Sequence, residues 1–152
     1  MKRVALSARV VAAFIVTIRA DKIDPRLATI RKAFIIAADE LGDDQGVATC
    51  LADHLTSPIE VVKTKAEADV VLTVKAHIPS GTSRVLLGSM GASPSANLEA
   101  HLLDGTRIWS DGAKFRRGTG AIGLARDTQC GLADGLIKAL RDAMRKARDA
   151  KE

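Results

Sequence analysis

The chain has 152 residues, of which 47% are hydrophobic and 27% are charged, and its formal net charge is +5. This length fits one domain with a single core and is too short for two ordinary domains. Four basic residues lie within residues 1–20, so the net charge falls by four to +1 for residues 21–152, which keep three aromatic residues: Phe34, Trp109 and Phe115. Nucleic-acid binding is therefore disfavoured, because it depends on a basic surface and often on stacking aromatic side chains.

Residues 1–20 have the layout of a secretory leader. A basic stretch precedes the uncharged apolar run Val10–Ile18, and the small residue Ala20 closes the segment. The run is about half as long as a membrane-spanning helix requires. We therefore expect a leader that is removed on export, and one globular domain at residues 21–152 that is periplasmic or secreted. The alternative is that the segment forms an amphipathic first strand or helix of the folded protein.

The first elements after the leader are a strand and a helix. Ile30–Ala38 is a short apolar run that favours a buried strand, and an acidic turn follows it. Asp43 or Asp44 can cap a helix over about Gln45–Thr56, which Ser57-Pro58 stops. On a helical wheel, one face of this helix is expected to point inward and collects Val47, Cys50, Leu51, His54 and Leu55.

Further extended segments follow. Ile59–Val62 is predicted to be an extended segment. Apolar and polar residues alternate along Asp69–His77, which is typical of a half-buried strand. Its apolar face consists of Val70, Leu72, Val74 and Ala76. Between Pro79 and Asn97 the composition shifts to Gly, Ser and Pro, and the apolar patch Arg84–Leu87 within it predicts another strand flanked by turns.

A hairpin and a long helix complete the chain. Ala96–Leu103 and Thr106–Phe115 flank the Asp104-Gly105 step, which favours a tight hairpin turn because both positions tolerate positive φ. The helical period over about Asp127–Ala150 places an apolar stripe on one face, formed by Cys130, Ala133, Ile137, Leu140 and Met144. The order β-α-β-β-β-α predicts an α/β fold, an α+β two-layer sandwich with a mixed sheet of about four strands and two helices on one face.

Cys50 and Cys130 are the only cysteines, and both lie on the inward faces of the predicted helices. In a reducing cytosol they would be small buried hydrophobic residues, whereas outside it they are a candidate disulfide. Their wide separation lacks the close ligand spacing of a structural zinc site. A bond between them would contribute at most about 4 kcal/mol by closing a long loop.

The loop between the hairpin and the last helix contains a GxGxxG pattern, Gly118–Gly123, after Arg116 and Arg117. A dinucleotide site needs this pattern at the start of a βαβ unit, and only one helix remains before the C-terminus, so no nucleotide cofactor is predicted. A weaker anion site can be built from Arg116, Arg117, Gly118, Gly120 and Gly123 at the helix N-terminus. The competing interpretation is a glycine-rich turn with solvated arginines.

No other pattern indicates catalysis or metal binding. His77 and His101 can share the outer sheet face, but no third ligand is spaced to join them, so no metal site is predicted. The acidic cluster Asp39, Glu40, Asp43 and Asp44 can hold a cation, although helix capping already explains two of its members. The sequence also contains no nucleophile elbow, Walker loop or zinc-protease spacing, and we predict no catalytic residues.

The sheet face opposite the helices is a candidate contact surface. Val71, either Ile108 or Trp109, and the patch Val85–Leu87 can leave part of that face apolar. An apolar face or an exposed edge of this kind invites a partner strand or subunit. The alternative for Trp109 is that it fills the core.

Two motifs occur together: the tract Ala66–Leu72, in which Asp69 precedes a hydrophobic strand, and the hairpin motif Asp104-Gly105-x-x-Ile108-Trp109. With them, residues 30–145 resemble small bacterial envelope domains of periplasmic or lipoprotein type and, distantly, the N-terminal module of the Tol system's propeller protein. The resemblance implies a comparable sheet and no catalytic residues. Many such relatives are lipoproteins, but no cysteine lies near the end of the leader here, which favours a soluble periplasmic form.

Two functional hypotheses follow. The first is a non-catalytic secreted or periplasmic envelope domain that acts through protein contacts, with another envelope protein or with itself as the partner and without a stable membrane span. The alternative is a small-anion or nucleotide binder that uses Arg116, Arg117 and the Gly118–Gly123 loop.

Overall fold

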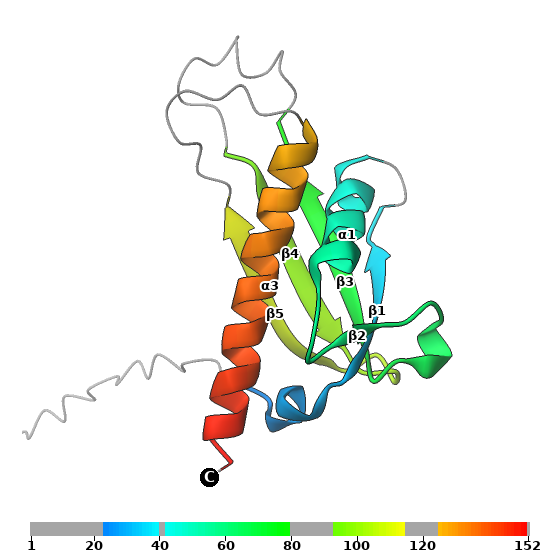
Figure 1. The fold of residues 1–152 in the computed structure, drawn as a ribbon, viewed down its shortest axis with the longest axis vertical. Helices are drawn as coiled ribbons and strands as arrows, with labels where there is room; N and C mark the ends of the chain where they lie inside the picture. Colours follow the sequence, from blue (N-terminus) through cyan, green and yellow to red (C-terminus); the bar gives the residue numbers. More distant parts are fainter. Residues whose placement is uncertain (1–22, 40–41, 80–92, 115–124, 152) are drawn as a thin grey trace, which may run out of the picture.

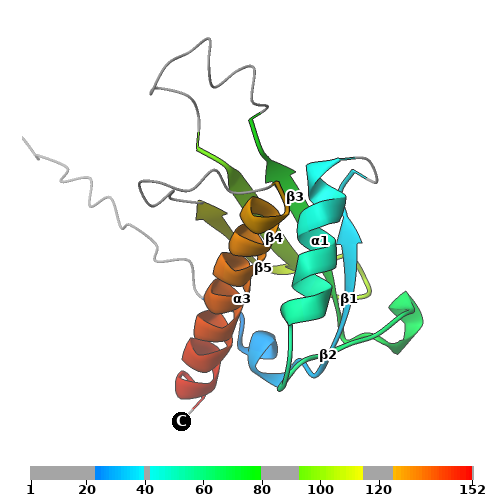
Figure 2. The ribbon, with the colours of Figure 1, turned by 45° about the horizontal axis from the view of Figure 1, so that its top comes forward.

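The computed structural model describes residues 23–39, 42–79, 93–114 and 125–151. Within these ranges a five-stranded sheet is covered on one face by two helices (Figures 1 and 2). The elements in chain order are the 3-10 turn η1 (Pro25–Thr29), β1 (Lys32–Ala37), α1 (Asp43–His54), β2 (Glu60–Val61), the 3-10 turn η2 (Lys65–Glu67), β3 (Val70–His77), β4 (Ser95–His101), β5 (Arg107–Lys114) and α3 (Ala125–Asp149).

The sheet has the strand order β2-β1-β3-β4-β5. Strand β1 is parallel to β2 and β3, whereas β4 is antiparallel to both β3 and β5. The predicted two-layer α/β sandwich with a mixed sheet is confirmed. It has five strands rather than about four, because Glu60 and Val61 pair with Lys32 and Ala33 at the start of β1. The predicted strand Arg84–Leu87 lies outside the described residues.

Strand β3 is central, and its alternation sets the face that meets the helices. Val70, Leu72 and Val74 are fully buried, while Lys75 and His77 on the other face are exposed. The start of β3 is joined to the start of β1 by one side chain: an Asp69 carboxylate oxygen accepts the backbone N–H groups of Arg31 and Lys32, both at 2.9 Å. Two hydrogen bonds to one charged group fix where the parallel strands begin.

The predicted cap of the first helix is wrong. Helix α1 begins at Asp43 after Gly42, which has φ 97° and makes no side-chain capping bond. The Asp44 carboxylate instead accepts the backbone N–H groups of Asp39 at 3.0 Å and Ala76 at 2.6 Å. The reason lies in the sheet: the register of β1 with β3 ends at Ala37 and Val74, so the N–H of Ala76 has no strand partner and takes a carboxylate.

The hairpin and the last helix follow their sequence signals. Gly105 has φ 89° in the turn between β4 and β5, and Asp104 accepts the backbone N–H of Thr106 at 2.8 Å, which lowers the pKa of that carboxyl. Helix α3 places an apolar stripe on the sheet, and its buried members are Leu132, Ala133, Leu136, Ile137, Leu140, Ala143, Met144 and Ala147.

Helices α1 and α3 lie side by side and run in the same direction (Figure 1). The predicted disulfide is present and joins Cys50 to Cys130, whose Cα atoms are 5.1 Å apart. One turn further along, His54 Nδ1 and Asp134 Oδ1 are 2.7 Å apart. His54 shares the apolar face of the helical wheel and is predicted to be partly buried; its side chain is 44% exposed, because it meets a surface carboxylate of the neighbouring helix. We call the contact of α1 with α3 the seam.

Candidate functional site

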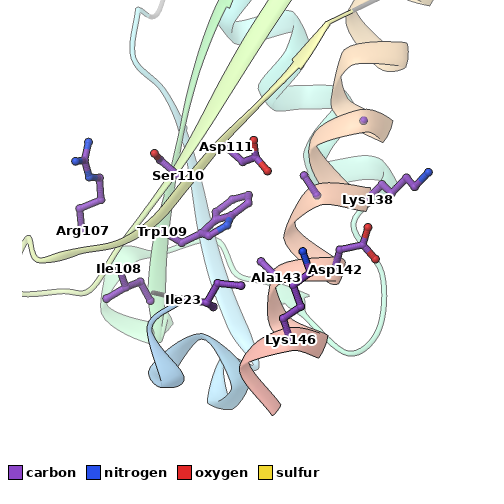
Figure 3. A pocket seen from close by; sticks show the side chains of 12 residues that line it. Ile23, Arg107, Ile108, Trp109, Ser110, Asp111, Lys138, Asp142, Ala143 and Lys146 are labelled. Carbon is purple, nitrogen blue, oxygen red and sulfur yellow. The ribbon is translucent and has the colours of Figure 1, made fainter. Parts of the chain in front are cut away.

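A groove of about 620 Å³ lies between β5 and α3, on the flank of α3 that faces away from α1. Trp109 and Asp111 point from β5 towards α3, whereas Ser110 points away (Figure 3). The strand pairing explains this orientation, because Trp109 pairs with the fully buried Ala100 and Asp111 with the fully buried Leu98. Paired residues share a face, so both side chains lie on the helix side of the sheet.

Short side chains on α3 keep the groove open. Gly135, Ala139 and Ala143 follow one another at four-residue spacing and line its helical wall. At Gly135 the two elements approach closely, since a Cβ there would lie 2.9 Å from the Ala113 Cβ. Further along α3 the wall combines Ala139 and Ala143 with longer polar side chains, and the half-buried indole of Trp109 occupies part of the space (Figure 3). A register shift at Ala100 and His101 marks a bulge at the start of β5.

The charges around the groove are unevenly satisfied. Its two carboxylates already have partners within this chain: Asp111 accepts the N–H of Gly112 at 2.7 Å, and Asp142 accepts from Arg145 at 3.2 Å. Lys138 and Lys146 on the helical wall have no ion-pair partner among the described residues. The N–H of Gly112 leaves the negative charge of Asp111 in place, so the groove lining carries a small excess of positive charge, with Arg107, Lys138 and Lys146 against Asp111 and Asp142.

The open face of the sheet is mainly polar. Glu99 is its best-connected residue: Oε2 lies 3.0 Å from His101 Nε2, and Oε1 lies 3.9 Å from an Arg107 nitrogen. The hydrogen bond from His101 lowers the pKa of the Glu99 carboxyl, with the positive charges of Lys75 and Arg107 acting in the same direction. Of the apolar residues expected here, Val71 is 6% and Ile108 is 7% exposed, whereas Ile36, which pairs with Thr73 on this face, is 38% exposed.

The other predicted site residues do not come together as a site. His77 and His101 lie at opposite ends of the open face, since His77 pairs with Ser95 and His101 with Val71. Within the described ranges, no group of three or more His, Cys, Asp or Glu is placed to hold a metal ion. Arg116, Arg117 and the Gly118–Gly123 loop lie outside the described residues, as do residues 1–20, Glu40 and the patch Val85–Leu87.

Sequence reasoning missed the helical wall of the groove. Gly135, Ala139 and Ala143 recur every fourth residue of α3, and this run of small residues is visible in the sequence. It indicates that one flank of the helix has no bulky side chain. Which element faces that flank depends on the sheet order, and the sequence does not provide that information.

The comparisons with known proteins concern the fold. No protein-family model and no curated protein matches the sequence. The PelC dodecamer from Paraburkholderia phytofirmans in space group P6 is 15% identical, with a TM-score of 0.46 over 72% of this chain and 86% of that chain. A leucine-to-methionine variant of that dodecamer in space group C2 is 15% identical, with a TM-score of 0.47 over 70% of this chain and 85% of that chain. At these values neither likeness assigns a function to this chain.

Proposed function

We propose that the protein is exported and acts in the bacterial envelope as a non-catalytic domain that works through contacts with other proteins. The observation that carries the proposal is the disulfide between Cys50 and Cys130. Such bonds persist in oxidising compartments and are rare in the cytosol. The leader-like pattern of residues 1–20 and the resemblance to small envelope domains point to the same compartment.

One feature supports a contact role. The groove combines an exposed sheet edge with a half-buried tryptophan, a residue type enriched at protein interfaces.

Fractionation of cells that express the full chain with a C-terminal tag tests export. Thiols are blocked with a maleimide before lysis, so that the oxidation state is the one inside the cell. We expect the product in the periplasmic fraction, shorter than the full chain by the leader, and with Cys50 and Cys130 protected from the reagent until a reductant is added. A variant that lacks residues 2–20 is the matched control, and we expect it in the cytoplasm with both thiols reactive.

Cross-linking in the same cells tests the contact role. We expect a discrete adduct of higher mass that contains the exported protein and is absent for the variant that lacks residues 2–20. A full-length, reduced product in the cytosol would contradict export. Exported protein that yields only uncross-linked monomer would contradict the contact role and leave export standing.

A further inference from the structure

We propose that β5 and the groove beside it bind an extended segment of a partner protein, which adds to the sheet as a further strand and carries acidic flanks around an apolar centre. This inference rests on the proposed contact function and names the class of partner and its site. It is carried by the edge strand, the open groove, the orientation of Trp109 and the charge of the groove.

The two edges of the sheet differ in what they offer. On one side, the two-residue strand β2 covers only the start of β1 and leaves residues 34–37 as a short open edge. Strand β5 is eight residues long and pairs only with β4 within the described part of the chain. An edge strand directs alternate N–H and C=O groups outward, and an added strand gains affinity from them. The bulge near Ala100 and His101 leaves Trp109–Lys114 as its regular part.

The groove gives the side chains of an added strand a place to go. Successive side chains of a strand alternate between the two faces of the sheet, so every second residue beside β5 would enter the space against α3. There it would meet the indole of Trp109, Ile23 and Ala143 (Figure 3), and Ala139 also lines the space. Apolar residues at alternate positions fit this wall, because it offers methyl groups and an aromatic ring.

Charge decides against a second copy of this chain as the occupant. Basic residues stand at both ends of β5, Arg107 at its start and Lys114 at its end. Basic residues on an edge strand are a common protection against self-pairing. Lys138 and Lys146 add further positive charge beside the groove. Acidic residues flanking the partner's strand complement Lys114, Lys138 and Lys146, whereas Arg107 already lies 3.9 Å from Glu99.

Trp109 is the only tryptophan of the chain, so its fluorescence reports directly on the groove. The probe is an eight-residue peptide, as long as β5, with alternating valine and threonine between glutamates at both ends. Its control replaces the glutamates by lysines. With the full chain we expect a blue shift of the emission with the acidic peptide and about tenfold weaker binding of the basic one. Hydrogen exchange should show new protection confined to the β5 amides.

Two matched variants locate the binding. Ala139→Leu fills the groove from its helical wall, and Ala52→Leu makes the same change at a half-buried alanine of α1 beside the opposite edge of the sheet. We expect the first to abolish the fluorescence shift and the second to leave it unchanged. Circular dichroism of both variants confirms that they remain folded.

Several results would overturn the inference. Equal affinity for the acidic and basic peptides would contradict selection of an acidic partner. Absence of hydrogen-exchange protection in β5 at millimolar peptide would contradict strand addition. Self-association that Ala139→Leu abolishes would replace the partner by a second copy. These outcomes are separate from the proposed function, because an exported protein that fails to bind the peptides keeps its compartment and its cross-linked adduct.

Discussion

The two flanks of α3 differ in how they are closed. On the seam side, α3 is joined to α1 by a disulfide and by the His54–Asp134 contact, and just beyond the end of α1 Arg141 donates a hydrogen bond to Thr56 at 3.0 Å. On the groove side, α3 touches β5 closely at Gly135 and then leaves a space of about 620 Å³. The same helix thus anchors the fold with one flank and leaves an open surface with the other.

Small residues act differently on the two flanks. On the seam, Gly46 has no Cβ, and the side-chain amide of Gln129 lies where one would be, so the helices pack without a gap. On the groove side, Ala139 and Ala143 are too short to reach β5, so the space stays open. A small residue allows two elements to pack tightly only when a side chain from the partner element fills the space that it leaves. Function is therefore more readily assigned to the groove than to the seam.

Removing the disulfide should have the largest effect. The double variant Cys50→Ala, Cys130→Ala is expected to lose up to about 4 kcal/mol of its free energy of unfolding, because the cross-link restricts a long loop in the unfolded chain. Denaturant unfolding with and without reductant measures this. The emission of Trp109 before the transition should not change, since it lies on the other flank of α3.

Reductant should lower the stability of the unmodified protein to that of the double variant and leave the double variant unaffected. If the oxidised protein and the double variant unfold at the same denaturant concentration, the seam does not depend on the covalent bond.

The close approach at Gly135 should give an intermediate effect. Gly135→Ala gains about 1 kcal/mol of helix propensity but forces its Cβ against that of Ala113, and overpacking of this kind costs about 1–3 kcal/mol. We expect a net loss of about 1 kcal/mol in the free energy of unfolding. In an Ala113→Gly background the obstacle is gone, so the same substitution should stabilise.

The unfolding curves of four proteins, the unmodified one, the two single variants and the double variant, form a double-mutant cycle that isolates this contact. An equal effect of Gly135→Ala in both backgrounds would show that α3 and β5 do not press together there, and the contrast between the flanks would then weaken.

The smallest effect is expected at the polar contact of the seam. His54 and Asp134 are 44% and 62% exposed, so water screens their interaction. His54→Ala and Asp134→Ala should each cost about 0.5 kcal/mol of the free energy of unfolding, and together little more than either alone. Asp53→Ala, at an exposed neighbour in α1, serves as the control. A coupling energy between His54 and Asp134 well above about 0.5 kcal/mol would mean that the contact is part of a larger network.

Local pattern was enough to predict much of the fold. The alternation from Val70 to His77 identified the central strand, and the Asp104-Gly105 step identified the hairpin. The helical period placed Cys50 and Cys130 on inward faces, which allowed the disulfide to be predicted. These features depend on neighbours within a few residues, so a single sequence contains them.

Other features depend on register. The Asp44 carboxylate accepts the backbone N–H of Ala76 only because β3 continues past the end of β1, and nothing near Asp44 in the sequence indicates this hydrogen bond. Glu60 and Val61 form a strand only because β1 offers them an edge. For the same reason the sequence allows both a core and a surface position for Trp109, and the pairing with Ala100 places its side chain in the groove.

The sequence by itself determined the long strands, the helices and most of their inward faces, because the periods of two and 3.6 residues record which side of each element is apolar. The tertiary structure alone decided which elements face one another across the flanks of α3, and therefore where the open groove lies. The physical reason is that the space between two elements depends on strand order, register and the side chains of both partners, which are far apart in the chain.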